Sequence, residues 1–269
     1  MTQRFSDLMA MHAVGPGRLQ ATPAGGGGFQ FGGLTTAMAL SAAGTTVDEG
    51  LVPMSVRCNF PSFGRLGPTD IEVEDVSTSR SFANRRLRLV QDGRLMAAAE
   101  ATFHRLEAGA DVQNVDPVDI AGPEQLDEVP ARFGTDELVD PVELRPAHPL
   151  APGVLECLHP YWARVRQPLG PDPLAHAAGL AFISDYMVIF SPFPAGSGQS
   201  AGLTSFTLEH TVWFHRPVQA DQWMLFDCRP LTLSAGRFVS RGTVHDHAGR
   251  LVASFVQEGF IRHRPPDVA

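Results

Sequence analysis

The stretch SFANRRLRLVQDGRLMAA at 81–98 has a second copy in the chain, RFVSRGTVHDHAGRLVAS at 237–254. The two copies align without a gap, and an internal repeat of this kind organises the whole fold. Each copy predicts a β-hairpin, because strand-like residues flank a short turn that contains glycine. The matched pairs are Phe82 with Phe238, Arg85 with Arg241, Gly93 with Gly249, Arg94 with Arg250, Leu95 with Leu251 and Ala97 with Ala253.

A helix-like stretch precedes each hairpin, FGGLTTAMALSAAGTT at 31–46 and PLAHAAGLAFISDYMVIF at 173–190. Both are apolar nearly all round, so each helix must be buried. An antiparallel sheet has one face free to cover such a helix. The sequence therefore predicts an α+β protein of two tandem repeats, each an antiparallel sheet wrapped around a central helix.

The segment between the copies is rich in proline and acidic. Residues 106–149 hold eleven Asp and Glu side chains against Arg132 and Arg145. We therefore divide the chain into an N-terminal repeat at 1–107, an acidic, proline-containing linker at 108–138 and a C-terminal repeat at 139–269. Since the formal net charge of the chain is −8, its acidity belongs mainly to the connection and says little about a substrate.

Composition excludes several classes of function. The 269 residues include no lysine, which excludes chemistry that needs an amine nucleophile. The acidic balance argues against nucleic acid and anionic membranes as partners. Three separated cysteines suggest neither disulfides nor zinc. No signal peptide or membrane-spanning run is evident, so we expect a cytoplasmic protein.

Two motifs invite catalytic or metal assignments that their context does not support. GQSAG at 198–202 matches the nucleophile elbow around Ser200, but that elbow needs a strand before it and a helix after it. His245 and His247 lie two apart beside a predicted turn, with no third ligand evident. We expect a loop at Ser200, exposed turn histidines at 245 and 247, and no metal.

Polar residues in apolar surroundings are the candidate functional groups. Asp185 stands among apolar residues on every helical face, and is either a buried working carboxylate or a solvent-facing edge residue. Gln257 extends an apolar strand face, and its counterpart in the first repeat is Ala101. Either ordinary divergence after duplication or a single composite site explains this asymmetry. Gly32 and Gly33 open the first helix, as a ligand-binding N-terminus or a flexible turn.

These residues carry a resemblance. LAFISDYMVI at 180–189, SFTLEHTVWFHRP at 205–217, DQWMLFD at 221–227 and GRLVASFVQEGFIR at 249–262 resemble the acyl-CoA thioesterase II family. FGGLTTAMAL resembles the FGG-opened helix of that family, whose fold is a double hotdog. The resemblance implies hydrolysis of acyl-CoA by an activated water, with no cofactor.

The resemblance also implies roles for particular residues. Asp185 is the general base, and Thr207 and Gln257 orient the water. Backbone N–H groups of Gly32 and Gly33 are the candidates for stabilising the oxyanion. Two residues depart from the family pattern, Glu209 for Asp and Leu34 for Gln, and the second, after the glycine pair, leaves the substrate within the acyl-CoA class open.

Two alternatives remain. A catalytically silent double hotdog would bind acyl-CoA or a related ligand without cleaving it. A hydratase or dehydratase would need a His-Asp or His-Glu pair, for which the sequence has no motif. Exposed sheet edges in such repeats also make a homo-oligomer possible.

Overall fold

The computed structural model describes residues 4–23, 28–130, 141–148, 158–193 and 203–263. The first repeat and the segments around it contain α1 (Phe5–Leu8), β1 (Met11–Gly15), β2 (Arg18–Ala21), α2 (Gly32–Gly44), β3 (Leu51–Asn59), β4 (Thr69–Thr78), β5 (Phe82–Gln91), β6 (Arg94–Arg105) and the 3-10 turn η1 (Pro123–Gln125). The second contains β7 (Val142–Pro146), β8 (Tyr161–Val165), α3 (Pro173–Ser184), the 3-10 turn η2 (Val188–Phe190), β9 (Leu203–Phe214), β10 (Met224–Ser234), β11 (Arg237–Asp246) and β12 (Leu251–His263).

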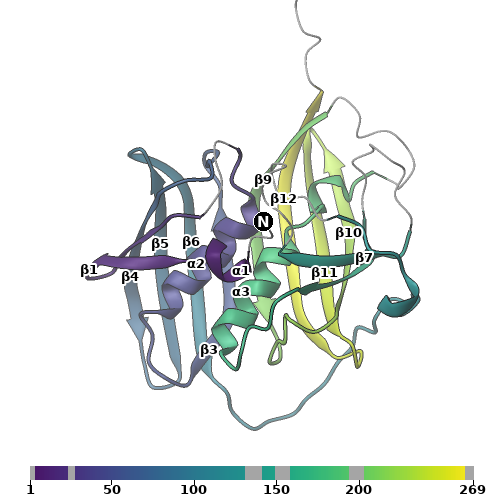
Figure 1. Cartoon of the computed structure of the whole chain (residues 1–269), viewed down its shortest axis with the longest axis horizontal. Helices are drawn as coiled ribbons and strands as arrows, with labels where there is room; N and C mark the ends of the chain where they lie inside the picture. The colour runs from purple at the N-terminus through teal and green to yellow at the C-terminus, as the bar shows by residue number, and fades with distance from the viewer. Residues whose placement is uncertain (1–3, 24–27, 131–140, 149–157, 194–202, 264–269) are drawn as a thin grey trace, which may run out of the picture.

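The twelve strands in the described part of the chain form one antiparallel sheet, in the order β1-β2-β4-β5-β6-β3-β9-β12-β11-β10-β8-β7. The two repeats meet at the pair β3–β9, where Val56 lies opposite Val212. Outward from this seam, the first repeat continues as β6, β5 and β4 and the second as β12, β11 and β10. The two halves therefore have the same strand order, as Figure 1 shows. The predicted pair of sheets is therefore continuous through main-chain hydrogen bonds.

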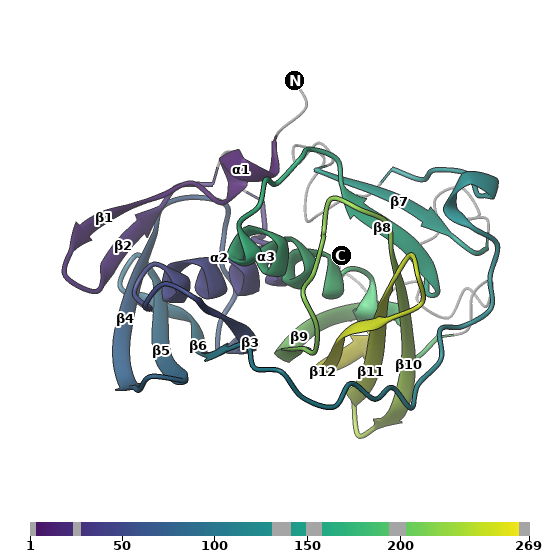
Figure 2. The same cartoon turned by 90° about the horizontal axis from the view of Figure 1, so that it is seen from below.

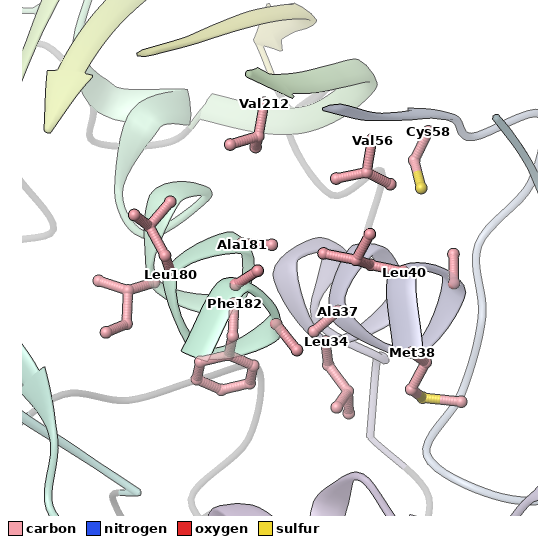
Figure 3. Close-up of a cluster of buried hydrophobic side chains, with 14 of the residues drawn as sticks. Leu34, Ala37, Met38, Leu40, Val56, Cys58, Leu180, Ala181, Phe182 and Val212 are labelled. Atoms are coloured by element: carbon pink, nitrogen blue, oxygen red, sulfur yellow. The ribbon is translucent and has the colours of Figure 1, made fainter. Parts of the chain in front are cut away.

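The two central helices pack against each other inside the curved sheet (Figure 2). Leu34, Ala37, Leu180 and Phe182 are fully buried around this helix pair. Figure 3 shows Val56 and Val212 of the seam beside the same cluster. Burial of each helix on nearly every face is what the apolar sequences required.

The predicted hairpins are present with different turns. Asp92 and Gly93 both have positive φ, 50° and 74°, and connect β5 to β6 as a two-residue turn. In the second copy only Gly249 has positive φ, 80°. The Asp246 carboxylate there accepts hydrogen bonds from the N–H groups of Ala248 and Arg250 and holds a longer turn. Residue type alone does not account for the difference, because Ala235 takes a positive φ of 51° in the turn between β10 and β11.

The second helix is shorter than the predicted 173–190. α3 ends at Ser184, Asp185 caps it, and Met187 has the left-handed φ of 59°. Residues 173–190 pass a length and composition test for a membrane-crossing helix, but 67% of that segment is buried inside the protein. The segment is the core helix of this fold and the turn that follows it.

The expectation of two exposed histidines was half wrong. His247 is exposed, whereas His245 is 1% exposed. The ring of His245 lies 3.1 Å from the carbonyl oxygen of Val115, because residues 111–115 of the connecting segment cover this hairpin. The Gln113 side chain bonds Gly249 and Leu251 in the same place. The local pattern of polar and apolar residues around His245 does not show that a distant segment of the chain covers it.

Candidate active site

A cavity of about 350 Å³ lies where the start of α2 meets the end of α3 and the first half of β9. Asp185, Thr207 and Gly32 lie on its wall. The rest of the lining is mainly apolar, which suits a hydrocarbon chain. Its six phenylalanines are Phe29, Phe31, Phe60, Phe63, Phe190 and Phe206.

Asp185 is a buried carboxylate at the end of α3. It is 5% exposed, so the solvent-facing alternative for this residue is wrong. Burial raises the pKa of Asp185 to about 7, against the opposing effect of hydrogen bonds from the Gly33 N–H, Thr207 and Gln257. A carboxyl group with this pKa exists in both protonation states near neutral pH, as a general base requires.

Thr207 and Gln257 extend a hydrogen-bonded chain from that carboxylate. The Gln257 amide Nε2 donates to Thr207 Oγ1 at 2.9 Å, and the Thr207 hydroxyl lies 3.4 Å from Asp185 Oδ1 as its donor. Thr207 faces the cavity, whereas Gln257 lies behind it and is fully buried. The chain therefore runs in one direction, from Gln257 through Thr207 to Asp185.

A β-bulge in β9 brings these groups together. Gln257 pairs with His210 and Gly259 pairs with Thr207, so Leu208 is the extra residue on β9. Without the bulge, Thr207 and His210 would point to opposite faces of the sheet. With it, both side chains reach the end of α3.

Gly32 and Gly33 permit a close approach between the two repeats. A Cβ at Gly32 would lie 2.7 Å from Asp185 Oδ2, and one at Gly33 would lie 2.3 Å from the Phe182 carbonyl oxygen. Absence of a side chain lets the Gly33 N–H reach the Asp185 carboxylate. The positive end of the α2 dipole thus faces the cavity, which favours negative charge there.

All five residues that the sequence analysis selected, Gly32, Gly33, Asp185, Thr207 and Gln257, meet at this cavity or directly behind it. The two departures from the family pattern lie elsewhere. Leu34 is fully buried in the core, and Glu209 binds Arg57 at 2.6 Å. Ser200 lies outside the described residues. Among the residues described, His, Cys, Asp and Glu side chains form no group that could hold a metal.

Sequence reasoning missed three supporting residues. The Ser184 hydroxyl lies 2.8 Å from His210 Nε2, directly beside the carboxylate. Tyr161 places its hydroxyl 3.2 Å from the Ile183 carbonyl oxygen and so supports the end of α3. The sequence signal for His210 was its position as a polar residue directly before the apolar run of β9. The signal for Tyr161 was its rarity, since the chain has only two tyrosines.

Known families match both halves of the chain. Residues 20–104 match the model described as "Acyl-CoA thioesterase N-terminal domain", and residues 121–261 match "Acyl-CoA thioesterase C-terminal domain". Acyl-coenzyme A thioesterase 8 of Rattus norvegicus is 28% identical over 258 residues, covering 87% of this chain and 81% of the relative. Acyl-CoA thioesterase 2 of Haemophilus influenzae is 26% identical, covering 86% and 87%.

Solved structures agree on the fold. An acyl-CoA thioesterase II from Mycobacterium marinum has a TM-score of 0.79 at 25% identity, covering 98% of both chains. A hot dog fold protein of unknown function from Alicyclobacillus acidocaldarius has a TM-score of 0.76 at 23% identity, covering 98% of this chain and 100% of the other. This chain therefore belongs to the acyl-CoA thioesterase family, and is an acyl-CoA hydrolase with the double hotdog fold.

Proposed function

We propose that Asp185 is the general base that activates the hydrolytic water in this acyl-CoA thioesterase. The observation that carries the proposal is a buried carboxylate with a pKa of about 7 on the wall of an apolar cavity. A base with a pKa near the working pH combines a useful fraction of ionised groups with enough basicity to take a proton.

The water binds between Asp185 and Thr207, which line the cavity from the end of α3 and from β9. Gln257 acts both through Thr207, whose hydroxyl accepts from its amide, and by its own hydrogen bond to the Asp185 carboxylate. As the water oxygen bonds to the thioester carbon, its proton passes to Asp185. The C–S bond then breaks, and CoA leaves as a thiolate, which needs no strong general acid.

The oxyanion of the tetrahedral intermediate faces the N-terminus of α2. We assign its stabilisation to the backbone N–H groups of Gly32 and Gly33, the first two residues of that helix. The Gly33 N–H donates a hydrogen bond to the Asp185 carboxylate. Protonation of Asp185 during attack weakens that bond, so the donor becomes available as charge develops on the carbonyl oxygen.

We place the acyl chain along the phenylalanines of the cavity. Phe29, Phe63 and Phe206 form a contiguous group, with the rings of Phe63 and Phe206 3.9 Å apart at their centroids. Phe29 and Phe63 are each more than half exposed. Burial of such a surface by an acyl chain is favourable at about 25 cal/mol per Å².

The test is release of free thiol from a panel of acyl-CoAs of increasing chain length by the wild-type protein and by Asp185→Asn. Asparagine keeps the size of the side chain but removes its basicity. We expect steady release by the wild type, its loss in the variant, and retained acyl-CoA binding in both. Unchanged turnover by Asp185→Asn would remove the base assignment. Binding without turnover by the wild type would instead indicate a silent acyl-CoA binder.

A further inference from the structure

A buried histidine supports the glutamine at the back of the site. His210 on β9 and Gln257 on β12 lie directly opposite each other in the strand register, and both are fully buried. His210 Nε2 lies 2.8 Å from the Ser184 hydroxyl. His210 Nδ1 and Gln257 Oε1 are both buried with no other hydrogen-bond partner, and the two side chains lie within hydrogen-bonding reach of each other. A protonated Nδ1 can donate a hydrogen bond and an amide oxygen can accept one, so the two atoms can satisfy each other.

These residues form a closed circuit of contacts that starts and finishes at the end of α3. From Ser184 the contacts run to His210, across the strand pair to Gln257, forward to Thr207 and back to Asp185. Ser184 and Asp185 are adjacent in the chain. A change in the orientation of any member therefore reaches the carboxylate.

We infer that His210 is a positioning residue that fixes the Gln257 carboxamide with its oxygen toward the imidazole and its amino group toward Thr207. This inference rests on the proposed role of Asp185. In this arrangement the Ser184 hydroxyl, which also lies 3.0 Å from the Ala181 carbonyl oxygen, turns its proton to Nε2 of a neutral ring, and Nδ1–H faces Gln257 Oε1. The opposite tautomer would place two lone pairs against each other in a buried site, which is costly.

The orientation of the amide matters because it sets the direction of the whole chain. If the carboxamide turned over, its oxygen would face Thr207 and accept the threonine proton. Thr207 could then no longer donate to Asp185, and the carboxylate would lose one of the bonds that stabilise its charged form. The base would ionise at higher pH, and the threonine hydroxyl would be turned away from its working direction.

The titratable groups around His210 do not supply this effect. Burial lowers the pKa of His210 to about 3 and that of His159, which packs on Tyr161, to about 4. Burial raises the pKa of the Cys58 thiol on β3 to about 12. Tyr186 follows Asp185 on the cavity wall. On β9 and β12, Glu209 is paired with Arg57 and Glu258 with Arg237.

The experiment compares His210→Phe with His210→Asn. Phenylalanine fills the space without a donor, whereas asparagine places an N–H close to the position of Nδ1. We expect His210→Phe to lower kcat by roughly tenfold, the scale of one hydrogen bond, with KM little changed. The acidic limb of its pH–rate profile should move to higher pH. His210→Asn should restore most of kcat and return the limb toward its original position.

His159→Phe is the matched control, since His159 is also a buried histidine, and its hydrogen bonds go to the backbone of Phe226 and Tyr186 rather than to Gln257. The acidic limb of the pH–rate profile of His159→Phe should stay where it is in the wild type. An unshifted limb in His210→Phe, or no recovery in His210→Asn, would overturn the inference. Should His210→Phe fail to fold, Ser184→Ala takes its place: a limb shifted to higher pH supports the inference, and an unshifted limb overturns it. Turnover retained by Asp185→Asn would instead contradict the proposed base.

Discussion

The carboxylate of Asp185 accepts a hydrogen bond from the backbone N–H of Gly33, which joins the end of α3 to the start of α2. The negative end of one helix dipole and the positive end of the other meet at this contact. Because the two residues come from different repeats, the base and the helix N-terminus face the same cavity only when both repeats are folded together.

The rate of hydrolysis should rise with pH through the pKa of Asp185, which is about 7. The ionised carboxylate is the active form, so activity is low below that pKa and reaches a plateau above it. A profile of kcat/KM against pH measures the limb directly. A flat profile from about pH 5.5 to about pH 8.5 would contradict the assignment of a base with this pKa.

Asp185→Asn should make the protein more stable at alkaline pH while it removes activity. The pKa of Asp185 is raised from 3.8 to about 7, so between these values the folded state binds more protons than the unfolded state. Wild-type stability therefore falls as pH rises through this window, by about 4 kcal/mol at most. Asparagine does not titrate. Denaturant unfolding at about pH 4 and about pH 8 should show a gain for the variant only at the higher pH.

Thr207→Val and Thr207→Ser separate the hydroxyl from the shape of the side chain. Valine neither accepts from Gln257 nor donates to Asp185, whereas serine does both. We expect valine to lower kcat on the order of a hundredfold, as misplaced catalytic groups do, and serine to retain most of it. Steady-state thiol release with both variants measures the difference. Equal activities would show that the hydroxyl has no role in turnover.

Gly33→Ala should disrupt the contact between the two helices. The added Cβ would lie 2.3 Å from the Phe182 carbonyl oxygen, and backbone cannot move aside as a flexible side chain can. We expect a lower melting temperature together with a lower kcat. Gly67→Ala is the control, because a Cβ there meets nothing within 4 Å. A Gly33→Ala protein that melts and turns over like Gly67→Ala would refute the close approach.

Arg85 should stabilise the first repeat far more than its neighbour does. Its side chain is 2% exposed and binds Asp75 at 2.7 Å and the carbonyl oxygen of Thr46 at 2.8 Å. Arg85→Met removes these bonds, together with those to the Thr46 and Thr78 hydroxyls, from a buried site, and we expect a loss of about 3 kcal/mol in the free energy of unfolding. Arg86→Met, at a side chain 54% exposed, should cost under ~1 kcal/mol. Comparable losses would contradict this ranking.

Much of the fold could be predicted from the chain because local signals agree with the repeat. Asp92-Gly93 fits a two-residue turn that needs positive φ, and the structure has it. The continuous pairing of β3 with β9 was not predicted, since a partner far away in the chain leaves no local pattern. The end of α3 was also missed. Met187 takes a left-handed φ without being glycine, so the usual stop signal is absent from the sequence.

The candidate site was predictable in its residues but not in its connections. Asp185 and Gln257 stand out as polar residues in apolar surroundings, which burial makes costly without a partner. Their link through Thr207 depends on the extra residue at Leu208, because a regular strand would turn Thr207 or His210 away. Strand alternation alone does not show a bulge. His245 was misjudged for a related reason, since Val115 reaches it from another part of the chain.

The seam between β3 and β9 gives the connecting segment a distinct purpose. The main-chain bonds across this pair resemble those that join two separate subunits edge to edge. If the two repeats were free molecules, first-repeat pairs and second-repeat pairs would compete with mixed ones. Because the connecting segment tethers the two repeats, each first repeat has a second repeat at high local concentration. The mixed pair therefore forms in preference to pairs of identical repeats.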